Sequence, residues 1–157
     1  MIIVEECLDD LFSKLPMIDG FKPVYRWGNK HHLLKQLEIF SKESKSIYPL
    51  IYQTSNSSTQ YRGGVETKLT FVLACQNTNT DLTNEQRWAM SYRNVLYPLV
   101  ENIERAFYSE GGILWDGAYK ITEFPNYGSG EENFTADKWD AILFEADIRI
   151  SKIQSCN

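Results

Sequence analysis

Three stretches of the chain carry apolar residues at three- and four-residue steps, the period of an amphipathic helix. The first stretch spans residues 3–15 and ends before Pro16. The second spans residues 29–40, where Gly28 and Asn29 supply a turn and an N-cap residue. These two stretches predict two amphipathic helices in the N-terminal part of the chain.

The third stretch is the longest and predicts the core helix. Thr83 and Gln86 lie at the spacing of a capping box, and the apolar stripe after them continues to about residue 109. Pro98 lies inside the stripe and cannot donate a backbone hydrogen bond to the carbonyl of Asn94. We therefore expect a kink or a break near Tyr97.

Alternation of apolar and polar residues, or a run rich in β-branched and aromatic residues between turn residues, predicts the extended segments. They are, in chain order, residues 21–27, 47–53, 65–75, 113–124 and 139–150. The fourth segment contains Gly117, where we expect a bulge or a bend. In the third, Glu66, Lys68 and Thr70 face away from the apolar residues, so one side of that strand belongs to the core.

Two long polar segments, residues 54–64 and 125–137, separate these elements. We expect the first to be a flexible hairpin loop or the tip of two strands that project beyond the sheet. A small core does not require Tyr61, Tyr127 or Phe134, and long loops commonly bind partners. Another copy of the chain is the simplest partner; the alternative is that both loops are merely solvated.

The elements together predict an α+β fold, mainly an antiparallel β-sheet packed against one long helix, with additional N-terminal helices. A length of 157 residues with 43% hydrophobic residues is typical of one globular domain. We expect N-terminal helices at about 3–40, a sheet-plus-helix core at about 47–150 and a flexible tail at 151–157.

Charge and cysteine content narrow the classes of function. The net charge is −5 and the 16 Lys and Arg residues are scattered, which argues against tight nucleic-acid binding. No apolar run is long enough to span a bilayer, so we expect a cytosolic chain without a membrane partner. The three cysteines are far apart and form no CxxC pair, so neither a disulfide framework nor a zinc site is expected.

One short motif suggests chemistry. Glu66-Thr67-Lys68 has the Glu-x-Lys spacing of metal-dependent nucleases, which require an additional upstream Asp because a hard cation needs converging carboxylates. No Asp lies between Gly20 and Glu66, and Asp19 is expected in a turn. Strand alternation explains Glu66 and Lys68 equally well as residues of an exposed face.

The other polar candidates also have structural explanations. His31 and His32 are adjacent at a helix start, diverge by about 100°, and are expected to be exposed. Asp116 and Asp140 are expected to bond nearby backbone at a turn or a strand start. No serine elbow, phosphate loop or dinucleotide fingerprint occurs, so we expect no catalytic residues and no cofactor.

The order of elements nevertheless resembles a known family. The supporting motifs are YPLIY at residues 48–52, LYPL at 96–99 and WDAI at 139–142, each at the corresponding strand or helix. With these, the chain resembles the tail terminator and head-to-tail joining (neck) proteins of tailed bacteriophages over most of residues 1–150. Such proteins are small α+β subunits that form rings, typically hexamers.

The resemblance implies a structural virion protein, assembled in the host cytoplasm, that stops tail-tube growth and joins tail to head. Its partners would be its own copies and the neighbouring tail-tube and neck proteins, while DNA passes through without specific binding. The implied interface residues are Tyr61, Arg62, Glu66, Lys68, Thr70, Tyr127 and Phe134. Three alternatives stay open: another connector subunit, a divalent-metal nuclease using Glu66 and Lys68, and a monomeric host binding domain.

Overall fold

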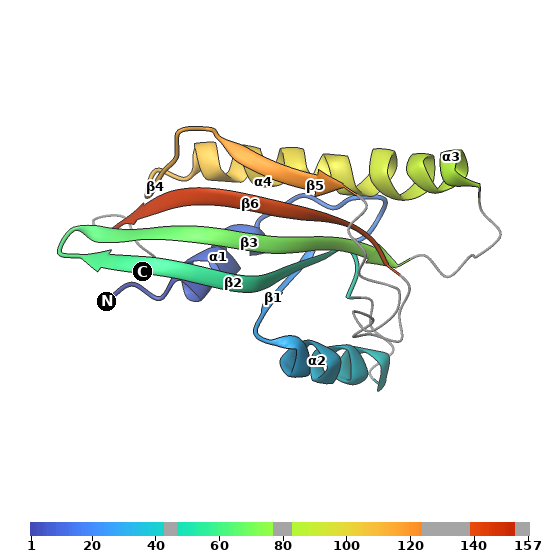
Figure 1. Cartoon of the computed structure of the whole chain (residues 1–157), viewed down its shortest axis with the longest axis horizontal. Helices are drawn as coiled ribbons and strands as arrows, with labels where there is room; N and C mark the ends of the chain where they lie inside the picture. Colours follow the sequence, from blue (N-terminus) through green and yellow to red (C-terminus); the bar gives the residue numbers. More distant parts are fainter. Residues whose placement is uncertain (43–46, 77–82, 124–138, 153–157) are drawn as a thin grey trace.

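The structure is a computed structural model that describes residues 1–42, 47–76, 83–123 and 139–152 (Figure 1). The helical elements are α1 (Val4–Ser13), α2 (Lys30–Lys42), α3 (Asn84–Arg87), η1 (Trp88–Leu96) and α4 (Tyr97–Ser109). The strands are β1 (Val24–Trp27), β2 (Leu50–Tyr61), β3 (Gly64–Gln76), β4 (Ile113–Leu114), β5 (Tyr119–Glu123) and β6 (Trp139–Ser151). The expected α+β class is confirmed.

The strands form one sheet in the order β1-β2-β3-β6-β4, with β5 also paired to β6. The pairings of β3 with β2 and β6 are antiparallel, as are those of β4 and β5 with β6. The β1–β2 pairing is parallel, because α2 carries the chain back before β2 begins. The sheet is therefore mixed, with an antiparallel centre.

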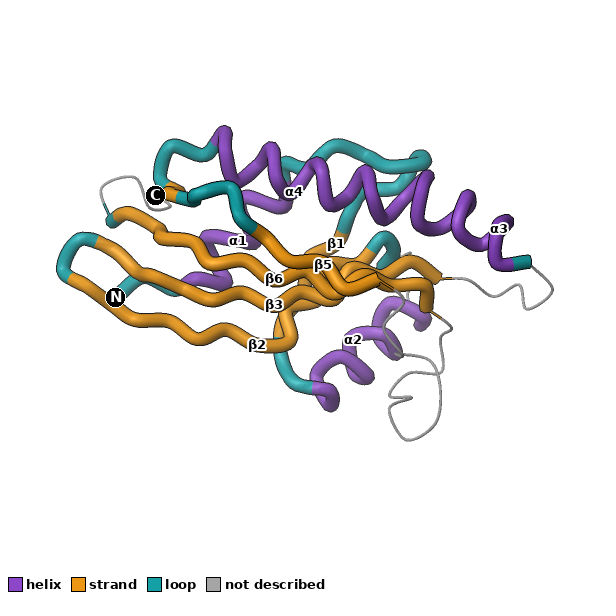
Figure 2. The backbone as a smooth tube through the Cα atoms, turned by 45° about the horizontal axis from the view of Figure 1, so that its top comes forward, coloured by secondary structure: helices purple, strands orange, loops and turns teal. Residues whose placement is uncertain are grey.

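Helices cover the two faces of this sheet unequally (Figure 2). The side chains of α1, η1 and α4 pack on one face in the main core, which includes Phe12, Phe71, Phe107 and Phe144. A second, smaller cluster lies on the other face, where Leu33 of α2 packs over one end of the sheet. The hairpin end of that second face has no helix over it in the described part of the chain (Figure 1).

The expected single long helix is wrong in detail, because three helical segments follow one another from Asn84 to Ser109. The capping box at Thr83 and Gln86 is confirmed. After it the chain winds as the π-helix η1, which ends with the Tyr97 N–H bonded to the Tyr92 carbonyl five residues back. Pro98 then lies in the first turn of α4, where a missing N–H costs nothing. Leu96 and Tyr97 both keep helical dihedrals, so the chain changes helix type without interruption where a kink or a break was expected.

Of the two alternatives expected for residues 54–64, the hairpin loop is wrong and the tip of two paired strands is found, although the tip stays within the sheet because β3 also pairs with β6 from Gly64 onward. Strand β2 continues to Tyr61 and pairs with β3 along its whole length, leaving a tight turn at Arg62 and Gly63. The register shifts once, between Gln53 and Ser55. The polar side chains are compatible with a strand because one set faces solvent while the other reaches α1: Asn56 Nδ2 donates to Glu5 at 2.6 Å.

The expected bulge at Gly117 is larger than one residue. Strands β4 and β5 both pair with β6, but Ile113 lies opposite Ile150 while Tyr119 lies opposite Ala146, so the chain loops out between them. Gly117 has φ +85°, which glycine adopts without strain. The Asp116 carboxylate accepts the Ala118 N–H at 2.8 Å, as expected for an aspartate in a turn.

Several expectations fall on residues outside the described ranges. These are the second polar segment, 125–137, with Tyr127 and Phe134, together with Cys156 and most of the expected tail. Ser151, the first residue of that expected tail, belongs instead to β6. Within the described ranges, no helix is both long and apolar enough to cross a membrane.

Candidate subunit interface

The exposed face of the hairpin end, called here the outer face, holds the described residues that the sequence predicted as an interface. Along β3, Val65, Thr67 and Leu69 are buried whereas Glu66 and Lys68 are exposed, which confirms the predicted alternation. Cross-strand register adds neighbours from β2 and β6 to this face. The outer face consists of Ser55, Ser57, Thr59, Tyr61, Glu66, Lys68, Thr70, Glu145, Asp147 and Arg149.

Glu66 is held by two neighbours on the outer face. The Tyr61 hydroxyl donates to Glu66 Oε2 at 3.2 Å, and Arg149 lies 3.9 Å from Glu66 Oε1 on the adjacent strand. The Arg149 guanidinium carbon also lies 5.7 Å from the centre of the Tyr61 ring. The pKa of Tyr61 is raised, first by its hydrogen bond to Glu66 and then by the negative charge of Glu66.

The remaining charges of the outer face also stand opposite one another. Lys68 lies directly across from Asp147, and Lys120 of β5 lies 3.7 Å from Glu145. Thr70 is across from Glu145 and is half-buried. The face therefore alternates in sign and presents no excess of positive charge to a nucleic acid.

The structure explains the Glu-x-Lys motif without a metal. The acidic residue that the nuclease hypothesis needs nearby is not supplied by Asp19, which lies in a separate turn with φ 52°. In the part of the chain that the structure describes, no group of three or more His, Cys, Asp and Glu residues could hold a metal ion. Glu66 is instead paired with Arg149.

The structure brings together five of the seven predicted interface residues. Tyr61, Glu66, Lys68 and Thr70 share the outer face, and Arg62 is exposed in the turn at its end. Tyr127 and Phe134 lie outside the described residues. His31 and His32 are both exposed, as predicted, and neither contributes to the outer face.

A second surface, called here the aromatic edge, lies on the opposite side of the sheet and was missed by the sequence analysis. Trp115 connects Tyr108 and Tyr119, with ring centres 4.9 Å and 6.0 Å from its own. Tyr108 is 63% exposed and Tyr119 is 38% exposed. No sequence pattern reveals this cluster, because Tyr108 comes from α4 and reaches Trp115 only through the tertiary fold.

A buried polar cluster was also missed. Asp140 was expected to bond nearby backbone, but its side chain is buried, accepts the Ser91 hydroxyl at 2.5 Å and lies 3.7 Å from Arg87 Nε. Burial raises the pKa of the neighbouring Cys75 thiol to about 11. The signal was present in the sequence: Asp140 has the same parity along β6 as the buried Ile142 and therefore faces inward.

Comparisons with known proteins add nothing to this geometry. No protein-family model, no curated protein and no solved structure matches the chain.

Proposed function

We propose that this chain is a structural virion protein of a tailed bacteriophage, assembled as a hexameric ring at the tail end or neck. It would stop growth of the tail tube and join the tail to the head. The observation that carries the proposal is the presence of two different exposed edges on opposite sides of one sheet. The order of elements that resembles tail terminators and neck proteins supports the choice of assembly.

The first edge belongs to β2. Among the described strands, β1 pairs with Leu50–Gln53 alone, so residues 54–61 present backbone groups along an open edge. This stretch contains no charged residue and no proline, the usual features that prevent pairing with another chain. The open edge of residues 54–61 adjoins the outer face, so the edge and the face form one continuous polar surface.

The second edge is the aromatic edge with Tyr108, Trp115 and Tyr119. Tyr and Trp are favoured at interfaces because they provide apolar area and a hydrogen-bonding group together. A ring requires two different, complementary patches on each subunit, since each copy meets its neighbours head to tail. The β2 edge of one copy meeting the aromatic edge of the next would supply such a contact.

The charge distribution supports passage of DNA through the ring without specific binding. The net charge is −5, and the positive residues of the outer face stand opposite negative ones. Like charge repels the duplex, and no basic stripe is present to release its counterions.

The test is the mass of the purified chain by light scattering across a concentration series, with negative-stain images. We expect rings with a mass near six times 18.2 kDa. Tyr108→Glu places a charge in the aromatic edge, where Tyr108 is 63% exposed, and we expect it to shift the mass toward the monomer. Met17→Glu is the matched control, since Met17 is 63% exposed and lies outside both edges.

Four outcomes would contradict the proposal in whole or in part. Equal assembly by Tyr108→Glu and the wild type would remove the aromatic edge from the contact. A strict monomer, with no ring even when purified tail tubes are added, would favour the monomeric binding domain. Rings that bind head connectors and not tail tubes would favour another neck subunit, and metal-dependent DNA cleavage abolished by Glu66→Ala would favour the nuclease.

A further inference from the structure

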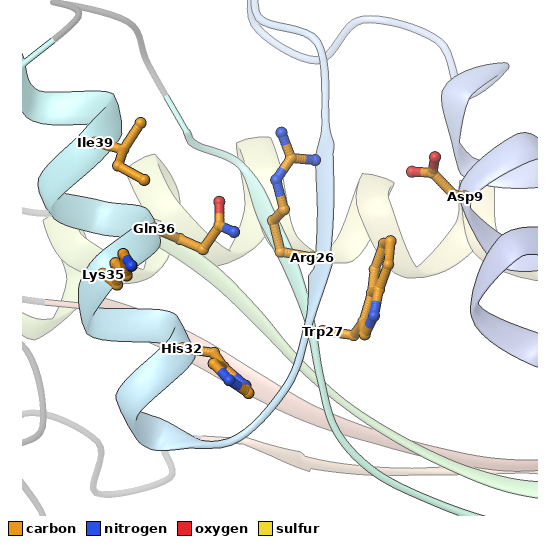
Figure 3. Close-up of a pocket in the computed structure, with 7 residues that line it drawn as sticks. All are labelled: Asp9, Arg26, Trp27, His32, Lys35, Gln36 and Ile39. Atoms are coloured by element: carbon orange, nitrogen blue, oxygen red, sulfur yellow. The ribbon is translucent and has the colours of Figure 1, made fainter.

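A pocket of about 480 Å³ lies beside β1, away from both edges that the ring proposal uses. Its lining residues lie on α1, β1 and α2, and Figure 3 shows Arg26 and Trp27 on β1 between the two helices. The lining residues are Asp9, Arg26, Trp27, His32, Lys35, Gln36 and Ile39. No sequence motif singled out this group.

The backbone of β1 is open toward the pocket. Val24 donates its N–H to Pro49 at 3.0 Å and Gly28 donates to Gln53 at 3.3 Å, both toward β2. Bonding alternates along a parallel strand, so Arg26 also faces β2 while the peptide groups of Tyr25 and Trp27 point outward. The outer side of β1 therefore offers N–H groups two residues apart, the spacing that an added strand requires.

The two walls of the pocket differ in character. Arg26 lies on the α2 side of β1 with His32 and Lys35, whereas Trp27 lies on the α1 side with Asp9 (Figure 3). Arg26 Nη1 donates to the Tyr25 carbonyl at 2.6 Å, which holds its guanidinium beside the open backbone. One wall is therefore basic in a chain of net charge −5, and the other is aromatic.

Gly28 fixes the position of the basic wall. Its φ is +133°, and a Cβ atom there would lie 2.7 Å from His32 Nδ1. The imidazole therefore packs directly against the turn that ends β1. On the other wall Trp27 is 43% exposed, and its ring is tilted by 30° to that of Tyr25 with ring centres 5.3 Å apart.

We propose that this groove binds an extended acidic segment of a partner protein, which adds as a strand along β1. Its backbone would bond the outward N–H groups of Tyr25 and Trp27, as in recognition by β-strand addition, since the Tyr25 carbonyl already accepts a hydrogen bond from Arg26 Nη1. Its side chains would alternate, with carboxylates toward Lys35 and apolar groups toward Trp27. Asp9 beside Trp27 disfavours a phosphate backbone, which would present negative charge to both walls.

The site is independent of the ring proposal, since none of its residues lies on the outer face or the aromatic edge. The probe is a capped peptide of about seven residues that alternates glutamate and valine, a usual length for one strand. Fluorescence anisotropy measures whether the peptide binds. We expect the bound peptide to slow amide hydrogen exchange at Tyr25 and Trp27 by at least about tenfold. The Arg26 amide, already directed toward β2, should not change.

Two controls separate strand addition from simple charge attraction. A peptide N-methylated at alternate positions keeps its carboxylates but cannot pair, and it should not bind. Lys35→Glu should weaken binding of the parent peptide about five- to tenfold. Lys68→Glu is the matched charge reversal on the outer face and should leave binding unchanged, with folding of both variants verified by circular dichroism.

The proposal fails if the glutamate–valine peptide does not bind, or if the N-methylated peptide or a lysine–valine peptide binds equally well. Protection of Tyr25 and Trp27 by an oligothymidylate would assign the groove to single-stranded nucleic acid instead. Their protection in the free chain, appearing only as protein concentration rises, would assign it to a second copy. Normal ring formation by Lys35→Glu would show that this substitution affects peptide binding in the groove without affecting the proposed ring.

Discussion

At the scale of single residues, Asp140 shows how a buried charge is accommodated. Its carboxylate bonds Ser91 and lies near Arg87, while the adjacent Tyr92 hydroxyl donates to the Ala141 carbonyl at 3.1 Å. Ser91 and Tyr92 both lie in η1, so the π-helix is anchored to the start of β6 by polar contacts. A buried group that loses its partner costs more than the original bond contributes.

We therefore expect Asp140→Ala to lower the free energy of unfolding by about 1–3 kcal/mol. The substitution leaves the Ser91 hydroxyl without its acceptor and removes the negative charge beside Arg87. Urea denaturation followed by circular dichroism measures the change. Asp147→Ala on the outer face is the control and should change stability by no more than about 0.5 kcal/mol. Equal losses in the two variants would show that the buried cluster contributes nothing specific.

At the scale of elements, the central feature is the β2–β3 hairpin and its pairing with β6. Gly64 opens β3 opposite Ser151, and it is buried against the β6 backbone. A Cβ atom on Gly64 would lie 2.3 Å from the Ile150 carbonyl oxygen, whereas one on Gly63 would meet nothing within 4 Å. The fold therefore leaves no room for a side chain at Gly64, whereas it leaves room for one at Gly63.

Gly64→Ala should lower the free energy of unfolding by about 1–3 kcal/mol, because the backbone of β6 must move away from the new methyl group. Gly63→Ala should be close to neutral, since its Cβ points into open space. Thermal and urea unfolding of the two variants measure the difference. If Gly63→Ala proved as destabilising as Gly64→Ala, the turn geometry rather than contact with Ile150 would be responsible.

At the scale of the whole molecule, the two proposed surfaces differ in the forces that would act on them. The proposed ring contact would join an uncharged strand edge to the aromatic edge, so hydrogen bonds and apolar burial would dominate. The proposed binding in the groove beside β1 would use Lys35 to attract carboxylates. Salt screens charge attraction between exposed groups but strengthens or leaves unchanged the burial of apolar surface.

Raising the ionic strength from about 50 mM to about 500 mM should therefore leave the ring mass unchanged and weaken peptide binding several-fold. Light scattering and fluorescence anisotropy in the same buffers provide the two readings. Loss of the ring at high salt would mean that its contact is made by charges, such as those around Glu66 and Arg149.

The sequence by itself determined the local elements. The period of apolar residues defined the helices and β6, the Thr83–Gln86 capping box marked a helix start, and alternation separated Glu66 and Lys68 from the core. These features depend on neighbours within a few residues along the chain. These features can therefore be predicted from the sequence without knowledge of the fold.

The tertiary structure alone decided which surfaces those elements create. Residues 54–61 form a strand because β3 offers a partner along their whole length, which outweighs their polar, loop-like composition. Asp140 is buried because η1 crosses the start of β6, and the aromatic edge exists because α4 brings Tyr108 beside Trp115. The groove beside β1 likewise requires α1 and α2 on either side of one open strand. Each depends on contacts between residues distant in sequence, which local patterns do not record.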